Sequence, residues 1–396
     1  MALLSVPPAK RIQSIDFLRG IIMAIMALDH SRDFFHSAAL ISKPLDPSTT
    51  YPALFFTRWI THFCAPTFVF LSGLSAWLQS QRKTKKELQW FLITRGLWLI
   101  VFDLTVLTFI LTADIHFGMF LLETLWSIGA GMIILGLLIN LPFRLILSIG
   151  LLIFFGHNLL DFAKRNSMSG LPPWWKLLQQ PGFIPLWKGH GVLVLYPFLS
   201  WAGLTLLGYC CGRLFTESKF AQRKKILVGI GVSLIVFFVI VRTINVYGDP
   251  GHWQTQSTVV KTFYSFMNVQ KYPPSLLFLC ATIGPVLILL ALLENIDNRF
   301  QRIISVFGRV PFFYFAVHLL ILHAAQIIIY LTRHSLSEGM KGASGAVVKF
   351  GAPGEGYSLP AVYAIWFSII LLMYPLCKQY DGYKRHNKNK WWLSYL

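Results

Sequence analysis

Charged residues are scarce in this chain. They make up 13% of its 396 residues, whereas an ordinary soluble domain has about 25%. Acidic residues are the scarcest, with 16 Asp and Glu against 35 Lys and Arg. Because hydrophobic residues reach 55%, the composition excludes a string of soluble domains and predicts one integral-membrane domain over residues 1–396.

Cysteine pairs with a recognisable spacing are also absent. The five cysteines lie singly or side by side within or beside apolar runs, and none belongs to a metal-binding or redox motif. We therefore expect neither a disulfide framework nor a bound metal. The opening residues, MALLSVPPAKR, lack a small-residue cleavage site, so we expect the first spanning helix to be retained.

Long apolar runs, by contrast, recur through the whole chain. A helix needs about 20 apolar residues to cross about 30 Å of hydrocarbon. The sequence therefore predicts an all-α polytopic membrane protein embedded in the lipid bilayer, with about ten transmembrane helices. The predicted spans are 15–36, 54–79, 88–111, 120–139, 143–162, 190–212, 226–243, 275–293, 308–332 and 359–377.

The distribution of positive charge predicts the orientation of these spans. With the N-terminus in the cytoplasm, 20 Lys and Arg residues fall in cytoplasmic connections and 11 in the opposite loops, which are longer. The positive-inside rule then places both termini in the cytoplasm. Topology also explains the net charge of +19 better than nucleic-acid binding does, so we expect no nucleic-acid partner.

Ionisable residues inside the predicted spans need an explanation, because each costs about 2.5–3.5 kcal/mol at a helix centre on insertion scales. At 1.5 Å per residue, most of them sort into an outer layer contributed by several helices. Convergence from separate helices favours a functional cluster over a solvated rim. The outer layer comprises Asp29, His30, Arg32, Asp33, His36, Arg58, His62, Glu123, His318 and His323.

The stretch LDHSRDFFH, residues 28–36, holds five of these groups. Asp33 lies four residues after Asp29 and three after His30, so either carboxylate can approach the imidazole on one helix face. A carboxylate beside an imidazole fixes its tautomer and stabilises its cation. His30 held in this way can act as a general base or as a nucleophile.

A smaller inner layer lies near the predicted cytoplasmic face and contains Asp16, Arg19 and Arg95. Arginine in a partly dry site suits phosphate binding, because its guanidinium presents a fixed fork of donors. Two other readings remain open: Asp16 can stabilise a helix N-terminus, and Arg19 can extend to the lipid headgroups. His62 and His318 can likewise be ordinary buried hydrogen-bonding residues.

Several sequence blocks carry a family resemblance. The chain opens with RIQSIDFLRGIIMAIMALDHSRDFF, and its second and sixth runs contain THFCAPTFVFLSGLSAWL and YPFLSWAGLTLLGY. Later blocks read PPSLLFLCATIGP, GRVPFFYFAVHLLILH and WWLSYL. In this order they resemble bacterial membrane proteins of the heparan-alpha-glucosaminide N-acetyltransferase catalytic-domain family.

The resemblance implies an integral-membrane acyltransferase, in a bacterial inner membrane, that takes an acyl group from cytoplasmic acetyl-CoA or another acyl-CoA. The acceptor it implies is an amino sugar or other envelope glycan on the opposite side. Relatives carry an Asn near the end of the first helix and a catalytic His shortly beyond it. Here His30 stands at the Asn position, and His36 is its rival for the catalytic role. His62 stands where the relatives have an acidic residue, which separates this chain from relatives that acetylate heparan.

Combined with the two layers, the resemblance assigns expected roles. The phosphates of CoA would lie near Arg19 and Arg95, with Asp16 beside them. His30, oriented by Asp29 or Asp33, would act as base or acyl carrier. The acceptor would meet the remaining outer-layer groups: Arg32, Arg58, His62, Glu123, His318 and His323.

Two other functions fit the same residues. Buried His, Asp and Arg in ten helices also suit a transporter for a proton-coupled or anionic solute, although the sequence shows no inverted repeat with matching broken helices. A scaffold for envelope assembly would need none of the ionisable groups for chemistry.

Overall fold

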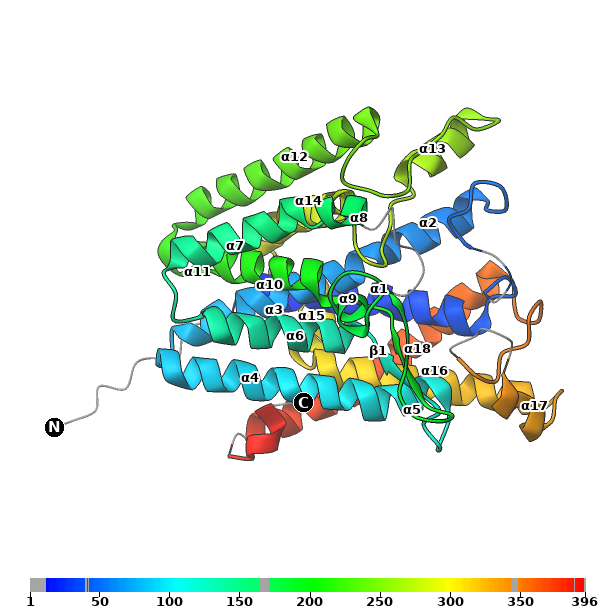
Figure 1. Cartoon of the computed structure of the whole chain (residues 1–396). Coiled ribbons are helices and arrows are strands. Elements are labelled where there is room, and N and C mark those ends of the chain that lie inside the picture. Colours follow the sequence, from blue (N-terminus) through cyan, green and yellow to red (C-terminus); the bar gives the residue numbers. More distant parts are fainter. Residues whose placement is uncertain are drawn as a thin grey trace.

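The computed structural model describes residues 12–39, 41, 43–163, 171–342, 348–387 and 389–394. These residues form mainly helices, which lie side by side and run from left to right in Figure 1. Short helices, a small sheet and most of the long loops gather at the right-hand end. We call this end the loop end of the bundle.

Seven helical stretches within the described residues are long and apolar enough to cross a membrane, which indicates an integral membrane protein. They are Pro52–Ser80, made of α2 (Pro52–Ile60), η1 (Thr61–Phe63) and α3 (Cys64–Ser80); Lys85–Thr112, made of α4 (Lys85–Phe102), η2 (Asp103–Leu107) and α5 (Thr108–Thr112); Phe198–Glu217, made of α10 (Phe198–Gly212) and α11 (Leu214–Glu217); Phe220–Ile244 (α12); Leu276–Asn295, made of α14 (Leu276–Leu292) and η3 (Leu293–Asn295); Pro311–Leu331 (α16); and Leu359–His386 (α18).

The three other predicted spans are helical as well, but each departs from a simple apolar crossing. α6 (Thr124–Leu138) and α7 (Phe143–Gly156) are shorter, with 15 and 14 residues. α1 (Gln13–Phe35) is long enough, but polar residues interrupt it. Sixteen of its 23 residues are buried, so its ionisable side chains face protein more than lipid. In Figure 1, α1 runs through the middle of the bundle.

A small sheet at the loop end corrects the all-α expectation. It has three strands in the order β1-β3-β2, with β1 (Met119–Leu122) parallel to β3 (Gly191–Val194) and β2 (Gly182–Pro185) antiparallel to it. The predicted spans 120–139 and 190–212 therefore begin as strands. Valine and leucine, which fill β3, suit a strand as well as a helix over so short a run.

Shorter helices connect these elements. Residues 299–307 are predicted as a connection between two spans, but with 308 and 309 they form α15 (Arg299–Arg309), an amphipathic helix that packs against α1. α18 continues nine residues beyond its predicted end at 377. The remaining bounds are α8 (Leu159–Ala163), α9 (Pro173–Leu178), α13 (Val259–Met267), α17 (Leu336–Lys341) and η4 (Trp391–Ser394).

Glycines set the distance between α3 and α10, one of the most extensive helix contacts in the bundle. A Cβ at Gly208 of α10 would overlap the backbone carbonyl of Phe70, and one at Gly73 of α3 would overlap that of Thr205. Neither carbonyl can rotate away as a side chain would. Small residues of this kind let transmembrane backbones approach closely.

We therefore expect Gly208→Ala to force α3 and α10 apart. Overpacking of this kind costs about 1–3 kcal/mol, which should lower the thermal unfolding midpoint of the detergent-solubilised protein. Gly229→Ala is the matched control, since Gly229 lies within α12 and its added methyl group meets open space. Equal midpoints for the two variants would contradict this packing.

Candidate functional site

Asp29 is the centre of a buried ion cluster near the end of α1. Arg58 of α2 donates through Nη1 to both of its carboxylate oxygens, at 2.7 and 2.8 Å. Arg32, one helical turn further along α1, donates through Nη2 to Oδ1 at 2.7 Å. The hydroxyl of Thr61 adds a fourth bond at 2.9 Å. Asp29 thus ties α1 to α2 and η1.

Arg32 has a second carboxylate partner in Asp33, at 2.5 Å. The Asp33 side chain is 52% exposed, whereas that of Arg32 is 3% exposed. The cluster therefore extends from the interior at Asp29 to an accessible surface at Asp33.

His30 points to a different helix, because neighbouring residues on a helix face different directions. Its Nδ1 lies 2.8 Å from Nε2 of His318 on α16. Nδ1 of His318 lies 2.7 Å from the carbonyl oxygen of Tyr314, one turn earlier on α16. The partner of His30 is thus another imidazole, where the sequence pointed to Asp29 or Asp33.

This chain of contacts fixes the tautomers of the neutral pair. A carbonyl oxygen only accepts, so His318 carries its proton on Nδ1 and accepts on Nε2. His30 must then donate from Nδ1, which leaves a lone pair on its Nε2. That atom has no hydrogen-bond partner among the described residues, and His30 is only half-buried. The geometry presents a base or nucleophile to the space beside α1.

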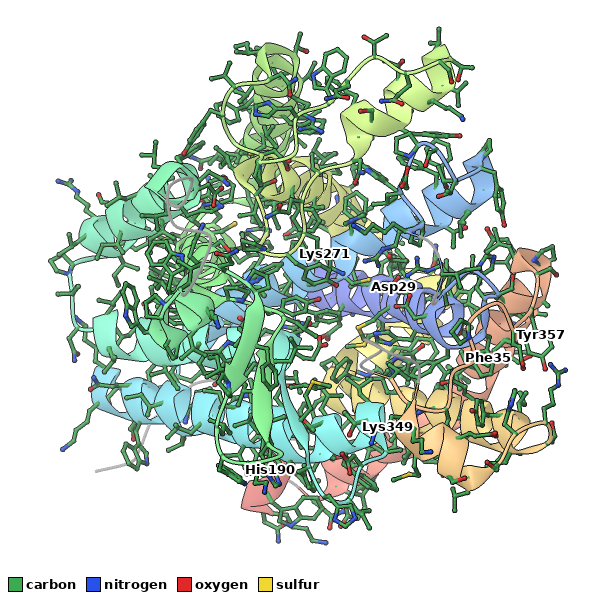
Figure 2. The ribbon with its side chains drawn as sticks, turned by 45° about the vertical axis from the view of Figure 1, so that its right-hand side comes forward. Asp29, Phe35, His190, Lys271, Lys349 and Tyr357 are labelled. Carbon is green, nitrogen blue, oxygen red and sulfur yellow. The ribbon has the colours of Figure 1, made fainter. Side chains whose placement is uncertain are left out.

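Glu123 and Lys271 bring two further charges to this space from loops. Glu123 lies between β1 and α6, and Lys271 lies in the loop before α14. The two interact electrostatically with each other, and Lys271 also with Asp29 and His30. Lys271 is 8% exposed. Figure 2 shows Lys271 and Asp29 near one another in the middle of the molecule.

We call this group the central site; its members are Asp29, His30, Arg32, Asp33, Arg58, Glu123, Lys271 and His318. Two tyrosines border it: Tyr196, which interacts electrostatically with Glu123, and Tyr272, which does so with Arg58. Their hydroxyls lie 3.5 Å apart. Tyr272 is 40% exposed, so the central site reaches the surface at the loop end.

A buried carboxylate positions Glu123. Asp103, in the single π-turn η2 that interrupts the α4–α5 stretch, accepts from the backbone N–H groups of Glu123 at 2.9 Å and Trp126 at 2.7 Å. It therefore caps the N-terminus of α6 from a neighbouring helix, where a negative charge is favourable. π-turns often mark functional sites, and this one fixes the backbone of a central-site residue.

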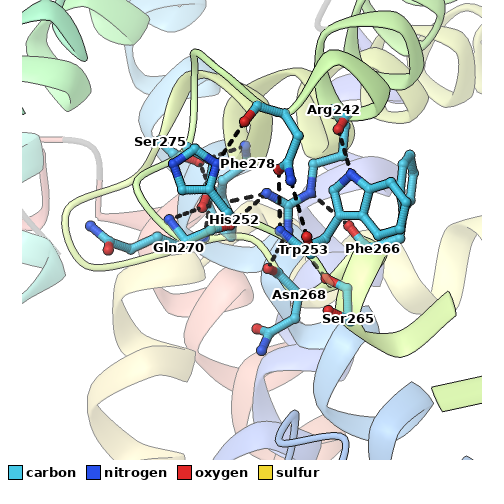
Figure 3. Close-up of polar contacts among 12 residues, drawn as sticks. Arg242, His252, Trp253, Ser265, Phe266, Asn268, Gln270, Ser275 and Phe278 are labelled. Atoms are coloured by element: carbon cyan, nitrogen blue, oxygen red, sulfur yellow. Dashed lines mark hydrogen bonds and ion pairs between the residues drawn. The ribbon is translucent and has the colours of Figure 1, made fainter. Parts of the chain in front are cut away.

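A second buried pair orders the loop that carries Lys271 (Figure 3). Arg242, at the end of α12, donates to the carbonyl oxygens of Phe266, Gly251, Ser265 and Asn268 at 2.7–3.1 Å. Its guanidinium also lies 3.7 Å from Asp249.

Asp249 in turn accepts from the N–H of Gln270 at 2.8 Å and the hydroxyl of Ser275 at 2.6 Å, the two ends of the segment around Lys271. Burial raises the pKa of the Asp249 carboxyl, while these hydrogen bonds and Arg242 oppose that shift.

The other predicted outer-layer histidines each contact backbone groups, through Nδ1 in His62 and His36 and through both nitrogens in His323. His62 contacts the Trp59 carbonyl through Nδ1 at 3.1 Å and packs against Phe278. In His36, Nδ1 accepts from the N–H of Ala38 at 3.2 Å. His323 places its nitrogens on the carbonyls of Ile110 and Lys349, so it joins α16 to α5 and a loop.

His36 and Asp33 also line a cleft at the loop end. Its other walls come from α16 and from the segment 350–357, and they include Gln326, Tyr330, Arg333 and Glu355. Because Asp33 belongs to both, the cleft adjoins the central site.

The inner-layer residues lie at the opposite end of α1. Arg19 contacts Ser75 and the Leu71 carbonyl of α3, and lies 3.7 Å from Asp16. Arg95 of α4 packs over the ring of Phe91 at 5.7 Å. Arg19 precedes His30 by eleven residues, about 16 Å along the helix. Within the described residues, no group of three His, Cys, Asp or Glu side chains is placed to hold a metal ion.

Fold and site together define a class: an integral membrane protein whose helices enclose ionisable groups around an imidazole with a free lone pair. Residues 11–243 match the family model described as heparan-alpha-glucosaminide N-acetyltransferase, catalytic. The chain belongs to this family, and so to the membrane acetyltransferases. No curated protein matches the chain.

The family match confirms the resemblance carried by the sequence blocks and favours the enzyme over the transporter and the scaffold. The matched region includes Asp29, His30, Arg58 and Glu123 but ends before Lys271 and His318. Sequence reasoning named His318 and passed over Lys271, because a single lysine in a long loop carries no signal of its own. Only the fold brings it beside α1.

We expect Asp29→Asn to destabilise the protein strongly, since it leaves two buried guanidinium groups without their shared carboxylate. Removing one partner of a buried pair costs about 3–5 kcal/mol. Asp33→Asn makes the same change at the half-exposed partner of Arg32, where the cost is about 0–1 kcal/mol. Thermal unfolding in detergent separates the two variants. Adding Arg58→Met to Asp29→Asn should recover part of the loss, and equal costs for the two single variants would contradict the central role of Asp29.

Proposed function

We propose that this protein transfers an acetyl group from acetyl-CoA to the amino group of an amino sugar or related envelope glycan. The observation that carries the proposal is the His30–His318 contact, which holds a proton on Nδ1 of His30 and leaves Nε2 as a base in a half-buried position. Membership of the acetyltransferase family supplies the reaction class.

In this proposal His30 acts as a general base. The acceptor nitrogen attacks the thioester carbonyl carbon, and Nε2 of His30 takes the proton that the nitrogen loses. The new C–N bond forms, the C–S bond breaks, and the imidazolium returns the proton to the CoA thiolate. Nδ1 of His36 already accepts from a backbone N–H, and both nitrogens of His323 contact carbonyls. His62 also keeps a lone pair on Nε2, because its Nδ1 donates to the Trp59 carbonyl, but it is buried, whereas His30 is half-buried and therefore the more accessible base.

The donor would enter from the end of α1 that carries Arg19, with Arg95 on α4, which contacts α3 and α6. Both guanidinium groups can bind phosphate, and Asp16 would hold Arg19 in place. The phosphopantetheine arm would then span the distance of about 16 Å along α1 to His30. This route assigns the N-terminal end of α1 to the cytoplasm and fits the positive-inside prediction for a bacterial inner membrane.

The acceptor would enter from the loop end. Asp33 joins the cleft to the central site, so a glycan in the cleft, beside His36, could extend its terminal sugar toward His30. Glu123 would bind the ammonium group of the incoming acceptor. Arg32 and Arg58 form ion pairs with Asp29, and His62 and His323 lie outside the lining of the cleft.

We expect His30→Ala to abolish acetyl transfer while acetyl-CoA still binds. Loss of a general base lowers the rate by roughly 10²–10⁴-fold, measured as transfer of radioactive acetyl to glucosamine by the protein in detergent. Acetyl-CoA binding is followed by the shift of the thermal midpoint. His190→Ala is the control, since His190 lies before β3, where its ring nitrogens contact backbone carbonyls and its ring packs against Trp187. Retained turnover in His30→Ala would overturn the assignment.

The same labelled donor distinguishes two roles of His30, general base and acyl carrier. In acceptor-free protein quenched within milliseconds, the general-base route leaves no protein-bound acetyl group. Acetyl attached to His30 would instead assign it the role of nucleophile.

A further inference from the structure

Two charges of the central site have no direct partner. Asp29, Asp33, Arg32 and Arg58 all form ion pairs of 2.5–2.7 Å with one another. Among the described residues, by contrast, neither Lys271 nor Glu123 has an opposite charge within 4 Å or a side-chain hydrogen bond. The ammonium nitrogen of Lys271 lies 5.1 Å from the centroid of the Tyr272 ring.

The backbone around each of these two residues is held separately. Asp249 fixes the segment around Lys271 at Gln270 and Ser275, and Arg242 fixes the end of the preceding helix α13 through the carbonyls of Ser265, Phe266 and Asn268 (Figure 3). Asp103 fixes Glu123 through its backbone N–H. The loop is thus held in place by buried charges of its own, and Lys271 is presented to the interior from a rigid support.

A cation in a protein interior without an ion-pair partner carries a desolvation penalty. The cation–π contact of Lys271 with Tyr272 offsets this penalty only in part. The site as a whole contains three basic and three carboxyl side chains, and Lys271 and Glu123 act on each other only at a distance. A ligand with one charge of each sign would satisfy both residues and leave the total unchanged.

We propose that Lys271 binds an anionic group of the acceptor, a carboxylate or a phosphate, while Glu123 receives the acceptor's ammonium group. The acceptor class is then an amino sugar that also carries a negative charge. This inference rests on the proposed function for the identity of the acceptor, but it assigns Lys271 a part in specificity and none in the chemistry at His30.

Glucosamine and glucosamine 6-phosphate test the proposal as a matched pair, because they differ only in the anionic group. The full-length protein in detergent should show a kcat/KM at least tenfold higher for the phosphate. Lys271→Met removes the charge and keeps the length of the side chain, so it should abolish this preference by lowering kcat/KM for the phosphate at least tenfold more than kcat/KM for glucosamine. Lys271→Arg should keep the preference.

Lys349→Met is the control, since Lys349 pairs with Asp114 at 3.3 Å outside the central site; Figure 2 shows the two lysines well apart. It should leave the preference intact. A preference that survives Lys271→Met would overturn the proposal, as would an equal loss of kcat with both acceptors, which would assign Lys271 to the thioester or to the fold.

Binding separates this inference from the proposed function. Thermal midpoints should rise more with glucosamine 6-phosphate than with glucosamine, and Lys271→Met should remove the difference. This result without any acetyl transfer would support anion binding by Lys271 and contradict the acetyltransferase proposal. No difference between the two compounds in the unaltered protein would overturn the role of Lys271.

Discussion

The rest of the site depends on one shared carboxylate. Asp29 accepts from Arg58, Arg32 and Thr61 inside a helix that is itself mostly buried. Such a cluster is tolerable in a membrane protein only because other helices surround α1 and replace lipid with hydrogen-bond partners. By fixing the face of α1 that meets α2, it also fixes the direction of the next residue, and His30 therefore meets His318 on α16.

The two charged residues that lie in loops, Glu123 and Lys271, depend on buried residues of other elements. Asp103 holds the start of α6 and with it Glu123, and the Arg242–Asp249 pair holds the loop of Lys271. In each case a buried charge binds backbone groups and thereby places a second charge in the central site. A rigid support of this kind suits a site that must orient a donor and an acceptor that enter from opposite ends.

The sequence predicted much of the bundle and part of the site. Apolar runs placed every long helix, and depth along the helices singled out Asp29, His30, Arg58 and His318. Spacing along one helix could not predict that His30 would pair across to α16, since Asp29 and Asp33 looked equally close.

Other features carried weaker signals or none. The strands β1 and β3 are four residues long and read as extensions of the apolar helices that follow them. Lys271 reaches the site only through the contacts of Asp249 and Arg242, which join residues distant in sequence. Asp103 lies within a predicted span, but its role as a cap for α6 requires the fold.

A structure with bound donor tests the central claim most directly. The suitable ligand is a ketone analogue of acetyl-CoA in which a methylene group separates the sulfur from the carbonyl, so that the acyl group cannot leave. We expect its carbonyl to lie in the central site beside Nε2 of His30, with the CoA phosphates at Arg19 and Arg95. A carbonyl bound next to His36 or His62 instead, or phosphates bound at the loop end, would contradict the account.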